Sequence, residues 1–319
     1  MTAALRHGLL AVALALGGAI GCGHGARAQA QLAAPYHPQQ TAGDTRILLV
    51  AGGDDVANFA EEVVAQRKLW RGAGVPRDAI ACYWAKPQGR AWTKDRRQYQ
   101  RLARALASCG RASPATVLDD LAALAASPPA LVYLYVTAHG VPQLSQAAGA
   151  WTLPPEERSW LAQPALALDG DPALRVQDTA ALLQARRDGR PDASLVLTPA
   201  TLHQALARLP ADTRKIVVLQ GCFSGGFVDG PHSLAAVPNT TVLTAAAADR
   251  PSFGCGSGTR TTFWGGALER VLGDHVDFGT TPAELPWRTI HEQVARRVTR
   301  LERALGQKPS RPQFRTSVR

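Results

Sequence analysis

The sequence predicts an α/β fold, a three-layer α/β/α sandwich built on a mostly parallel sheet. Five short apolar runs alternate along the chain with segments of helical periodicity, which is the order of elements in such a fold. The runs are nearly continuous in apolar residues, with few charged positions, as is typical of strands that helices cover on both faces. In sheets of this kind, ligands bind beyond the carboxyl ends of the strands. The residues that follow each run are therefore the first candidates for a functional site.

The elements can be assigned in order along the chain. The expected strands cover residues 46–51, 80–84, 131–137, 215–220 and 240–247. The expected helices cover residues 59–71, 99–107, 115–126, 199–209, 263–272 and 287–305. Gly72 and Gly74 end the first helix, and Thr198 is a suitable N-cap for the fourth. We expect one domain over residues 46–319, with a polar loop at 86–97 and an insertion rich in Pro, Gly and Asp at about 141–194.

The N-terminus has the pattern of an export signal. A basic start at Arg6 precedes an apolar run over residues 9–20, and Ala26-x-Ala28 has the small-residue spacing of a cleavage site. The apolar run is shorter than the about 20 residues that a membrane-spanning helix needs. We therefore expect residues 1–28 to be a signal peptide, residues 29–45 to be a flexible lead-in, and the mature protein to be periplasmic or secreted.

Charge and composition limit the partners. The chain carries a formal net charge of +10 at pH 7, which favours contact with acidic surfaces. No basic cluster is interleaved with aromatic residues, so no nucleic-acid partner is expected. Residues 19–22, Ala-Ile-Gly-Cys, resemble a bacterial lipobox, which leaves open a membrane tether through a lipid on Cys22. The oligomeric state is left open as well.

Four cysteines remain after the leader, and export would place them where disulfides persist. Cys82 lies in an expected strand and Cys109 closely follows the next expected helix, so this pair is the expected disulfide. Cys255 follows the fifth strand and could lie near Cys222, either as a free buried thiol or as a redox lock. No Cys or His spacing typical of a zinc site occurs, so no metal or other cofactor is expected.

Two of the strands end in a reactive side chain next to a glycine. The third strand leads into His139-Gly140, and the fourth leads into Gly221-Cys222. If these strands are neighbours, the imidazole and the thiol emerge at the same edge of the sheet, where the imidazole can favour the thiolate. The glycines allow a substrate backbone to approach closely. The backbone amides of Gly140 and Cys222 could form an oxyanion hole for the carbonyl that is attacked.

These residues also carry a family resemblance. The segments LVYLYVTAHGVP and KIVVLQGCFSGGF resemble the His-Gly and Cys-x-Ser-Gly motifs of the legumain family of cysteine peptidases. RILLVAGGDDVANF and VLTAAAADRPSFGC are similar to the family's first strand and to the segment that follows its nucleophile. The resemblance implies a caspase/legumain-like fold and a cysteine endopeptidase that works through an acyl-enzyme. It implies that Cys222 is the nucleophile, that His139 is its partner, and that Asn58 orients His139.

The sequence departs from the family at the pocket for the P1 side chain, the residue just before the cleaved bond. Where the family has an arginine and two acids, this chain has Ala60, Gln220 and Gly266. The resemblance therefore does not imply that the pocket accepts Asn. We expect Gln220 and Gly221 to contact the substrate. Glu61 and Asp249 are further candidates near the pocket that could favour a basic P1 side chain.

Three alternatives stay open at this point. A serine hydrolase could use Ser224, although Cys222 stands where the Gly-x-Ser-x-Gly elbow needs its first glycine. A non-catalytic binding or scaffold protein of the cell envelope could use the same fold. A peptide ligase or transpeptidase would share the acyl-enzyme but release it to an amine instead of water. For the endopeptidase, the partner is a protein or peptide substrate.

Overall fold

The computed structural model describes residues 45–53, 55–86, 95–142, 154–155, 157–158, 162–168, 179–191, 195–256 and 259–318. The predicted signal peptide, most of the lead-in and Cys22 lie outside these ranges. None of the helices in the described ranges combines the length and the apolar character that crossing a bilayer requires.

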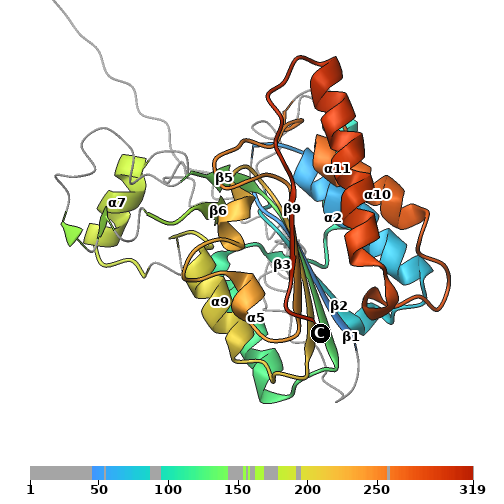
Figure 1. The fold of residues 1–319 in the computed structure, drawn as a ribbon, viewed down its shortest axis with the longest axis horizontal. Coiled ribbons are helices and arrows are strands. Elements are labelled where there is room, and N and C mark those ends of the chain that lie inside the picture. The colour runs from blue at the N-terminus through green and yellow to red at the C-terminus, as the bar shows by residue number, and fades with distance from the viewer. Residues whose placement is uncertain are drawn as a thin grey trace, which may run out of the picture.

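One seven-stranded sheet forms the centre of the molecule, in the order β3-β2-β1-β4-β7-β8-β9 (Figure 1). Its strands are β1 (Thr45–Ala51), β2 (Ile80–Trp84), β3 (Gly110–Arg111), β4 (Leu131–Thr137), β7 (Arg214–Gln220), β8 (Thr240–Thr244) and β9 (Gln313–Thr316). All neighbouring strands are parallel except β8 and β9, which are antiparallel. The predicted α/β class with a mostly parallel sheet is therefore confirmed, and the arrangement is consistent with a caspase-like fold.

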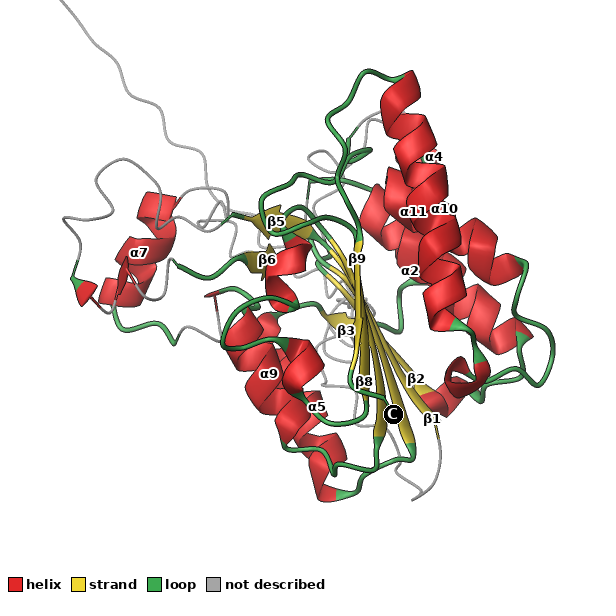
Figure 2. Cartoon of the chain, viewed as in Figure 1, coloured by secondary structure: helices red, strands yellow, loops and turns green. Residues whose placement is uncertain are grey.

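Helices cover both faces of the sheet (Figure 2). They are α2 (Asn58–Gly72), α4 (Arg96–Ala105), α5 (Pro114–Ala126), α9 (Pro199–Ala207), α10 (Phe263–Gly273) and α11 (Trp287–Ala304). A further helix, α7 (Thr179–Arg187), lies apart from the main sheet (Figure 1). One apolar core forms where α2, α4, α10 and α11 pack against the sheet, with Trp70, Trp264 and Ile290 fully buried. A second core forms on the opposite face beneath α5 and α9. Successive residues of the central strands point into the two cores alternately, which is why these strands are apolar throughout.

Several elements differ from the sequence-based expectation. The helix expected from residue 99 begins at Arg96, because Asp95 caps it by accepting hydrogen bonds from the amides of Arg97 and Gln98. Strand β8 ends at Thr244 instead of 247. The Ala245 amide is shared between the Leu219 carbonyl of β7 and the Ser224 hydroxyl, and the Ala246 amide donates to the Ser224 hydroxyl. Strands β3 and β9 were not predicted.

The predicted insertion contributes a small layer of its own. Strands β5 (His139–Val141) and β6 (Ala165–Ala167) form a separate antiparallel pair beside the carboxyl edge of the main sheet. Leu183 of α7 packs with this pair in a satellite apolar cluster. Since β5 begins at His139, the insertion is anchored directly next to the first residue of the expected dyad.

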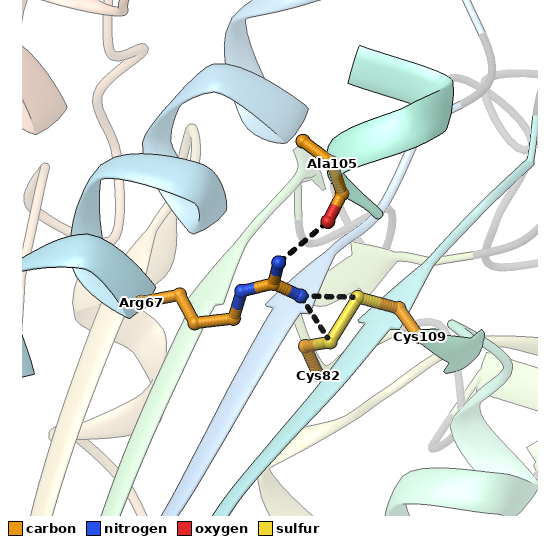
Figure 3. The surroundings of a disulfide bond; sticks show 4 residues. All are labelled: Arg67, Cys82, Ala105 and Cys109. Atoms are coloured by element: carbon orange, nitrogen blue, oxygen red, sulfur yellow. Dashed lines mark hydrogen bonds between the residues drawn. A yellow bond between two sulfur atoms is a disulfide. The ribbon is translucent and has the colours of Figure 1, made fainter. Parts of the chain in front are cut away.

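The predicted disulfide between Cys82 and Cys109 is present, which confirms the expected pairing (Figure 3). It joins β2 to the segment just before β3, at one edge of the sheet. Arg67 of α2 points Nη1 at both sulfur atoms, at 3.4 and 3.6 Å, and donates through Nη2 to the Ala105 carbonyl at 2.6 Å. The guanidinium thus connects α2, the disulfide and the end of α4.

Removing this bridge should lower the free energy of unfolding substantially. The two cysteines are 27 residues apart, and closing a loop of that size is worth roughly 3–4 kcal/mol by the chain-entropy account. A Cys82→Ala/Cys109→Ala double variant should therefore unfold at a lower urea concentration than the wild type. Reductant should shift the wild-type midpoint towards that of the variant and leave the variant unchanged. Equal midpoints without reductant would show that the bridge contributes nothing.

Candidate active site

The histidine and the cysteine lie at the ends of adjacent strands. Thr137 at the end of β4 pairs with Gln220 at the end of β7, and the chain continues in step beyond both strands. The Ala138 amide donates to the Gln220 carbonyl at 3.0 Å. A Cβ built on Gly140 would lie 1.7 Å from the carbonyl oxygen of Cys222. His139 and Cys222 are therefore carried by touching segments at one rim of the sheet, as predicted, and only glycine fits at position 140.

A tight turn follows Cys222. Phe223 has a φ of 59°, a left-handed conformation that is uncommon for a residue with a side chain, and its amide donates to the Arg250 carbonyl at 2.8 Å. Added Cβ atoms would lie 2.6 Å from the Ala248 amide at Gly225 and 2.3 Å from Pro164 at Gly226. The Cys-x-Ser-Gly-Gly sequence is thus what allows the chain to reverse directly behind the thiol.

The Cys222 thiol lies against the loop that follows β8. Its Sγ accepts from the Ser252 amide at 3.3 Å and is 3.4 Å from the Ser252 carbonyl. Burial raises the pKa of Cys222, and the backbone amides of Ser252 and Gly140 only partly oppose this effect. The neutral thiol is therefore the resting form, and the residue needs a base before it can act as a nucleophile.

His139 is held by Asp55 and Phe59. Its Nε2 lies 2.8 Å from Asp55 Oδ1, and Phe59 packs edge-on against the imidazole at 5.1 Å between ring centroids. Burial raises the pKa of Asp55, but the hydrogen bond and charge of His139 outweigh this and lower it overall. In the described structure no hydrogen bond joins His139 to Cys222, which is common before a substrate is bound. The Nδ1 atom has no partner among the described residues.

The expected role of Asn58 is wrong. Its buried amide turns away from His139: Nδ2 donates to the Thr259 carbonyl at 2.7 Å and Oδ1 accepts from the Gly256 amide at 3.1 Å. Asn58 therefore ties the loop after Cys255 to the start of α2, and Asp55 is the residue that orients the imidazole. Sequence reasoning missed Asp55 because the first turn holds two adjacent acids and nothing in the pattern distinguishes them.

A buried carboxylate connects the site to the helices behind it. Glu62 Oε2 accepts from the hydroxyls of Tyr135 and Thr137, and Oε1 accepts from the backbone amide and hydroxyl of Thr262, the N-cap of α10. A Cβ on Gly265 would lie 2.2 Å from this carboxylate. Burial raises the pKa of Glu62 in spite of the four hydrogen bonds. Glu62 thus fixes the positions of β4, α2 and α10 relative to one another.

Gln220 extends this polar cluster towards Cys222. Its side chain is fully buried, Oε1 lies 2.8 Å from Thr137 Oγ1, and Nε2 has no hydrogen-bond partner. A hydroxyl carries one proton, so Thr137 cannot donate to Gln220 and to Glu62 at once. An amide turned by 180° would donate to Thr137 and leave its oxygen unpartnered. Either way, one neutral polar atom two residues before the nucleophile is left without a partner.

Of the other predicted pocket residues, Glu61 is placed differently from the expectation. Glu61 is buried and ion-paired with Arg101, with Arg260 at 4.0 Å, so it offers no free charge to a basic P1 side chain. That prediction is therefore wrong for Glu61. Asp249 is largely exposed and lies 3.3 Å from Arg250. Gly221 touches the β4 end, where an added Cβ would lie 2.9 Å from the Ala138 carbonyl.

The remaining candidates concern Ser224 and Cys255. Ser224 is fully buried, and its hydroxyl accepts from the amides of Ala245 and Ala246. It therefore supports the turn and is not placed to attack a substrate. Cys222 and Cys255 are both free among the described cysteines. Burial and the nearby negative groups of Cys222, Glu62 and Asp55 raise the pKa of Cys255 to about 12, so its thiol is the less reactive one.

A mostly parallel sheet with a cysteine and a histidine at adjacent strand ends makes this an α/β protein whose arrangement is consistent with the caspase-like fold. Residues 190–315 match the model of the Peptidase C13 family, so the resemblance to legumain-like cysteine peptidases is confirmed. The matched range contains Cys222 and Cys255 but not His139. The match supports a cysteine peptidase-type function.

No curated protein matches the chain. Among solved structures, protein GSU0716 from Geobacter sulfurreducens is similar at 14% identity with a TM-score of 0.47, over 86% of this chain and 92% of that one. That likeness is too slight to say anything about activity.

Proposed function

We propose that the protein is a cysteine endopeptidase that cleaves peptide bonds with Cys222 and His139. The observation that carries the proposal is the in-step pairing of β4 and β7, which brings His139-Gly140 and Gly221-Cys222 to one rim. A thiol, an imidazole with an acidic partner, and backbone amides at the same place are the groups that acyl transfer needs. No metal or organic cofactor is required for this chemistry.

The mechanism follows from the order of these groups. Asp55 holds Nε2 of His139, and Nδ1 takes the proton from the Cys222 thiol. The thiolate attacks the substrate carbonyl carbon, and the amides of Gly140 and Cys222 stabilise the oxygen that becomes negative. The tetrahedral intermediate collapses as His139 gives the proton to the leaving amine, which leaves a thioester on Cys222. Water then adds to the thioester with His139 as base and releases the acid and the free thiol.

The P1 preference should not be for Asn alone. The side chain of Gln220, two residues before the nucleophile, is neutral and fully buried, so its expected contact with the substrate is wrong. The carboxylates of Glu61 and Glu62 are already occupied by other partners. None of these three side chains therefore offers a free charge to a P1 side chain. A panel of peptides that differ only at P1 tests this, and cleavage confined to Asn would contradict it.

The Cys82–Cys109 disulfide supports the further proposal that the protein is exported to the periplasm or beyond, because such bridges persist in oxidising compartments. Fractionation of cells that produce the full chain, with N-terminal sequencing of the product, would test this. A product that remains in the cytoplasm with an intact N-terminus would contradict it.

The proposed peptidase is tested by digesting a peptide library and reading the cleaved bonds by mass spectrometry. The matched sample is the same protein after reaction with an irreversible thiol-directed electrophile, whose site of attachment is mapped. We expect cleavage in the untreated sample, none in the treated one, and the label on Cys222. A peptide ligase would give joined products when an amine is added. A non-catalytic scaffold would give neither product.

Asp55 acts through His139, so its replacement should slow the reaction without weakening substrate binding. Asp55→Ala is expected to lower kcat by roughly 10²-fold with little change in KM, because the imidazole loses the group that holds it. Asn58→Ala is the matched control at the same end of α2. It should lower thermal stability, since it releases the loop at Gly256 and Thr259. Steady-state kinetics and thermal unfolding of both variants separate the two roles, and equal kcat values for Asp55→Ala and wild type would contradict the assignment.

A further inference from the structure

A large groove lies on the surface formed by α10, α11 and the segment before α10. It runs between the segment 259–263 and the exposed sides of α10 and α11, and its volume is 1210 Å³. The two helices pack side by side (Figure 1). Small residues of α10 make it hollow, because Gly266, Ala267 and Gly273 face it with almost no side chain.

Two exposed leucines border the groove. In the described part of the chain, three large apolar side chains are exposed, and two of them, Leu301 and Leu305 at 40% and 53% exposure, border this groove. Leu301 lies in the last turn of α11, and Leu305 is the residue that follows the helix. An apolar patch rimmed by charged residues is typical of a binding surface.

The charges around the groove are mostly positive. Arg260 pairs with Glu269 at 2.6 Å, and Arg297 lies 3.9 Å from Asp274. Arg270 and Arg300 also line the groove. Neither has an ion-pair partner within the ranges that the structure describes. After pairing, these two arginines leave the groove with an excess of positive charge beside its leucines.

We propose that this groove binds an acidic segment of a partner protein that carries apolar side chains. The leucines would take the apolar side chains, and Arg270 and Arg300 would pair with the carboxylates. A second copy of this chain is a poor occupant, because two chains that each carry a net charge of +10 repel one another. The proposal concerns binding alone and does not depend on catalysis.

The position of the groove also connects it to the catalytic rim. Its wall includes Thr259, which bonds to Asn58, and Thr262, which bonds to Glu62. The same stretch of chain begins at Ser252, which contacts the Cys222 thiol. A segment held in the groove therefore lies against Thr259 and Thr262, which are bonded to Asn58 and Glu62.

The test measures binding of a fluorescently labelled short peptide of Asp, Glu and Leu to the full chain by fluorescence anisotropy. Arg270→Glu/Arg300→Glu should weaken peptide binding by at least about tenfold. Leu301→Ser/Leu305→Ser should weaken binding by at least about tenfold at higher salt, where the charges are screened. The matched control is Arg296→Glu/Arg303→Glu, which makes the same charge change at exposed α11 positions outside the groove. It should bind as the wild type does. Circular dichroism of each variant confirms that it is folded.

Three results would overturn the proposal. Equal weakening by the groove and control variants would mean that the peptide responds to net charge only. Binding to vesicles of anionic lipid that depends on Arg270 and Arg300, with no binding of the peptide, would assign the surface to a membrane. Self-association in sedimentation that the groove variants abolish would assign it to a second copy of the chain.

Discussion

Replacing Cys222 by alanine is expected to reduce peptide cleavage by on the order of 10⁴-fold or more and to abolish labelling by a thiol-directed electrophile. The reason is that the proposed acyl-enzyme forms on this sulfur and no other described side chain at the rim can replace it. Ser224, two residues further along, is buried with its hydroxyl occupied by two amides. The turn itself is kept by Phe223 and the two glycines, so the variant should unfold at nearly the same temperature as the wild type.

The matched control for this experiment is Cys255→Ala, which removes the second free thiol from the same side of the molecule. Burial raises the pKa of Cys255 to about 12, so this thiol should contribute little to labelling at neutral pH. Cys255→Ala should therefore keep both cleavage and labelling. Labelling that persists in Cys222→Ala and disappears in Cys255→Ala would assign the reactive thiol to Cys255 and contradict the proposed nucleophile.

Glu62 should be the most sensitive polar position for stability. Glu62→Ala removes the acceptor for the hydroxyls of Tyr135 and Thr137 and for two groups of Thr262, all buried. Leaving buried donors unpaired and opening a cavity should lower the free energy of unfolding by about 3–5 kcal/mol. Denaturant titration of the variant measures this loss, and a change within about 0.5 kcal/mol would contradict the role of Glu62 as a hub.

Glu62→Gln distinguishes the shape of the side chain from its charge. Glutamine keeps an oxygen for Thr262, and its amide group can donate to the hydroxyls of Tyr135 and Thr137, which rotate to accept. Because burial raises the pKa of Glu62 in the folded state, its ionisation opposes folding. The protonated form of Glu62 therefore favours the folded state. Its contribution to stability is fully present below the pKa of the unfolded state and is lost as the pH rises through the pKa of the folded state. Relative to Glu62→Gln, the wild type should therefore become less stable as the pH rises from about 4 towards neutrality.

If the difference in the free energy of unfolding between the wild type and Glu62→Gln does not change with pH, then Glu62 has the same pKa in the folded and unfolded states. Measuring urea unfolding of both at several pH values gives this result directly. Since only the difference between two otherwise identical proteins is used, the other titrating groups cancel.

Much of the fold could be predicted because its central strands are apolar throughout. β2 and β4 begin and end where the sequence places them, since residues 80–84 and 131–137 are bounded by turn-forming residues and buried on both faces. Strand β9 could not be predicted from the sequence Gln-Phe-Arg-Thr. Four residues with one large apolar side chain give no periodic signal, and their strand conformation comes from pairing with β8.

The positions of the two dyad residues could be predicted because the strands that carry them could be predicted. His139 and Cys222 follow two apolar runs, so knowing that parallel strands end at one edge was sufficient to bring them together. Whether Asp55 or Asn58 is the partner of His139 depends on the conformation of the turn after β1. The two residues are only three positions apart, and the hydrophobic pattern of the sequence does not indicate that conformation. Glu62 resembles any charged residue of an amphipathic helix. Only packing shows that it faces the sheet.

Strand β9 has a consequence for handling the protein. It occupies the outer side of β8, where it takes up the backbone groups of Thr241–Thr244 that would otherwise be free. Deleting residues 313–316 would make β8 an edge strand with unpaired backbone N–H and C=O groups. Another extended chain could then pair with this exposed edge. Variants that lack residues 313–316 should therefore aggregate when the protein is concentrated. A purification tag should not replace these residues.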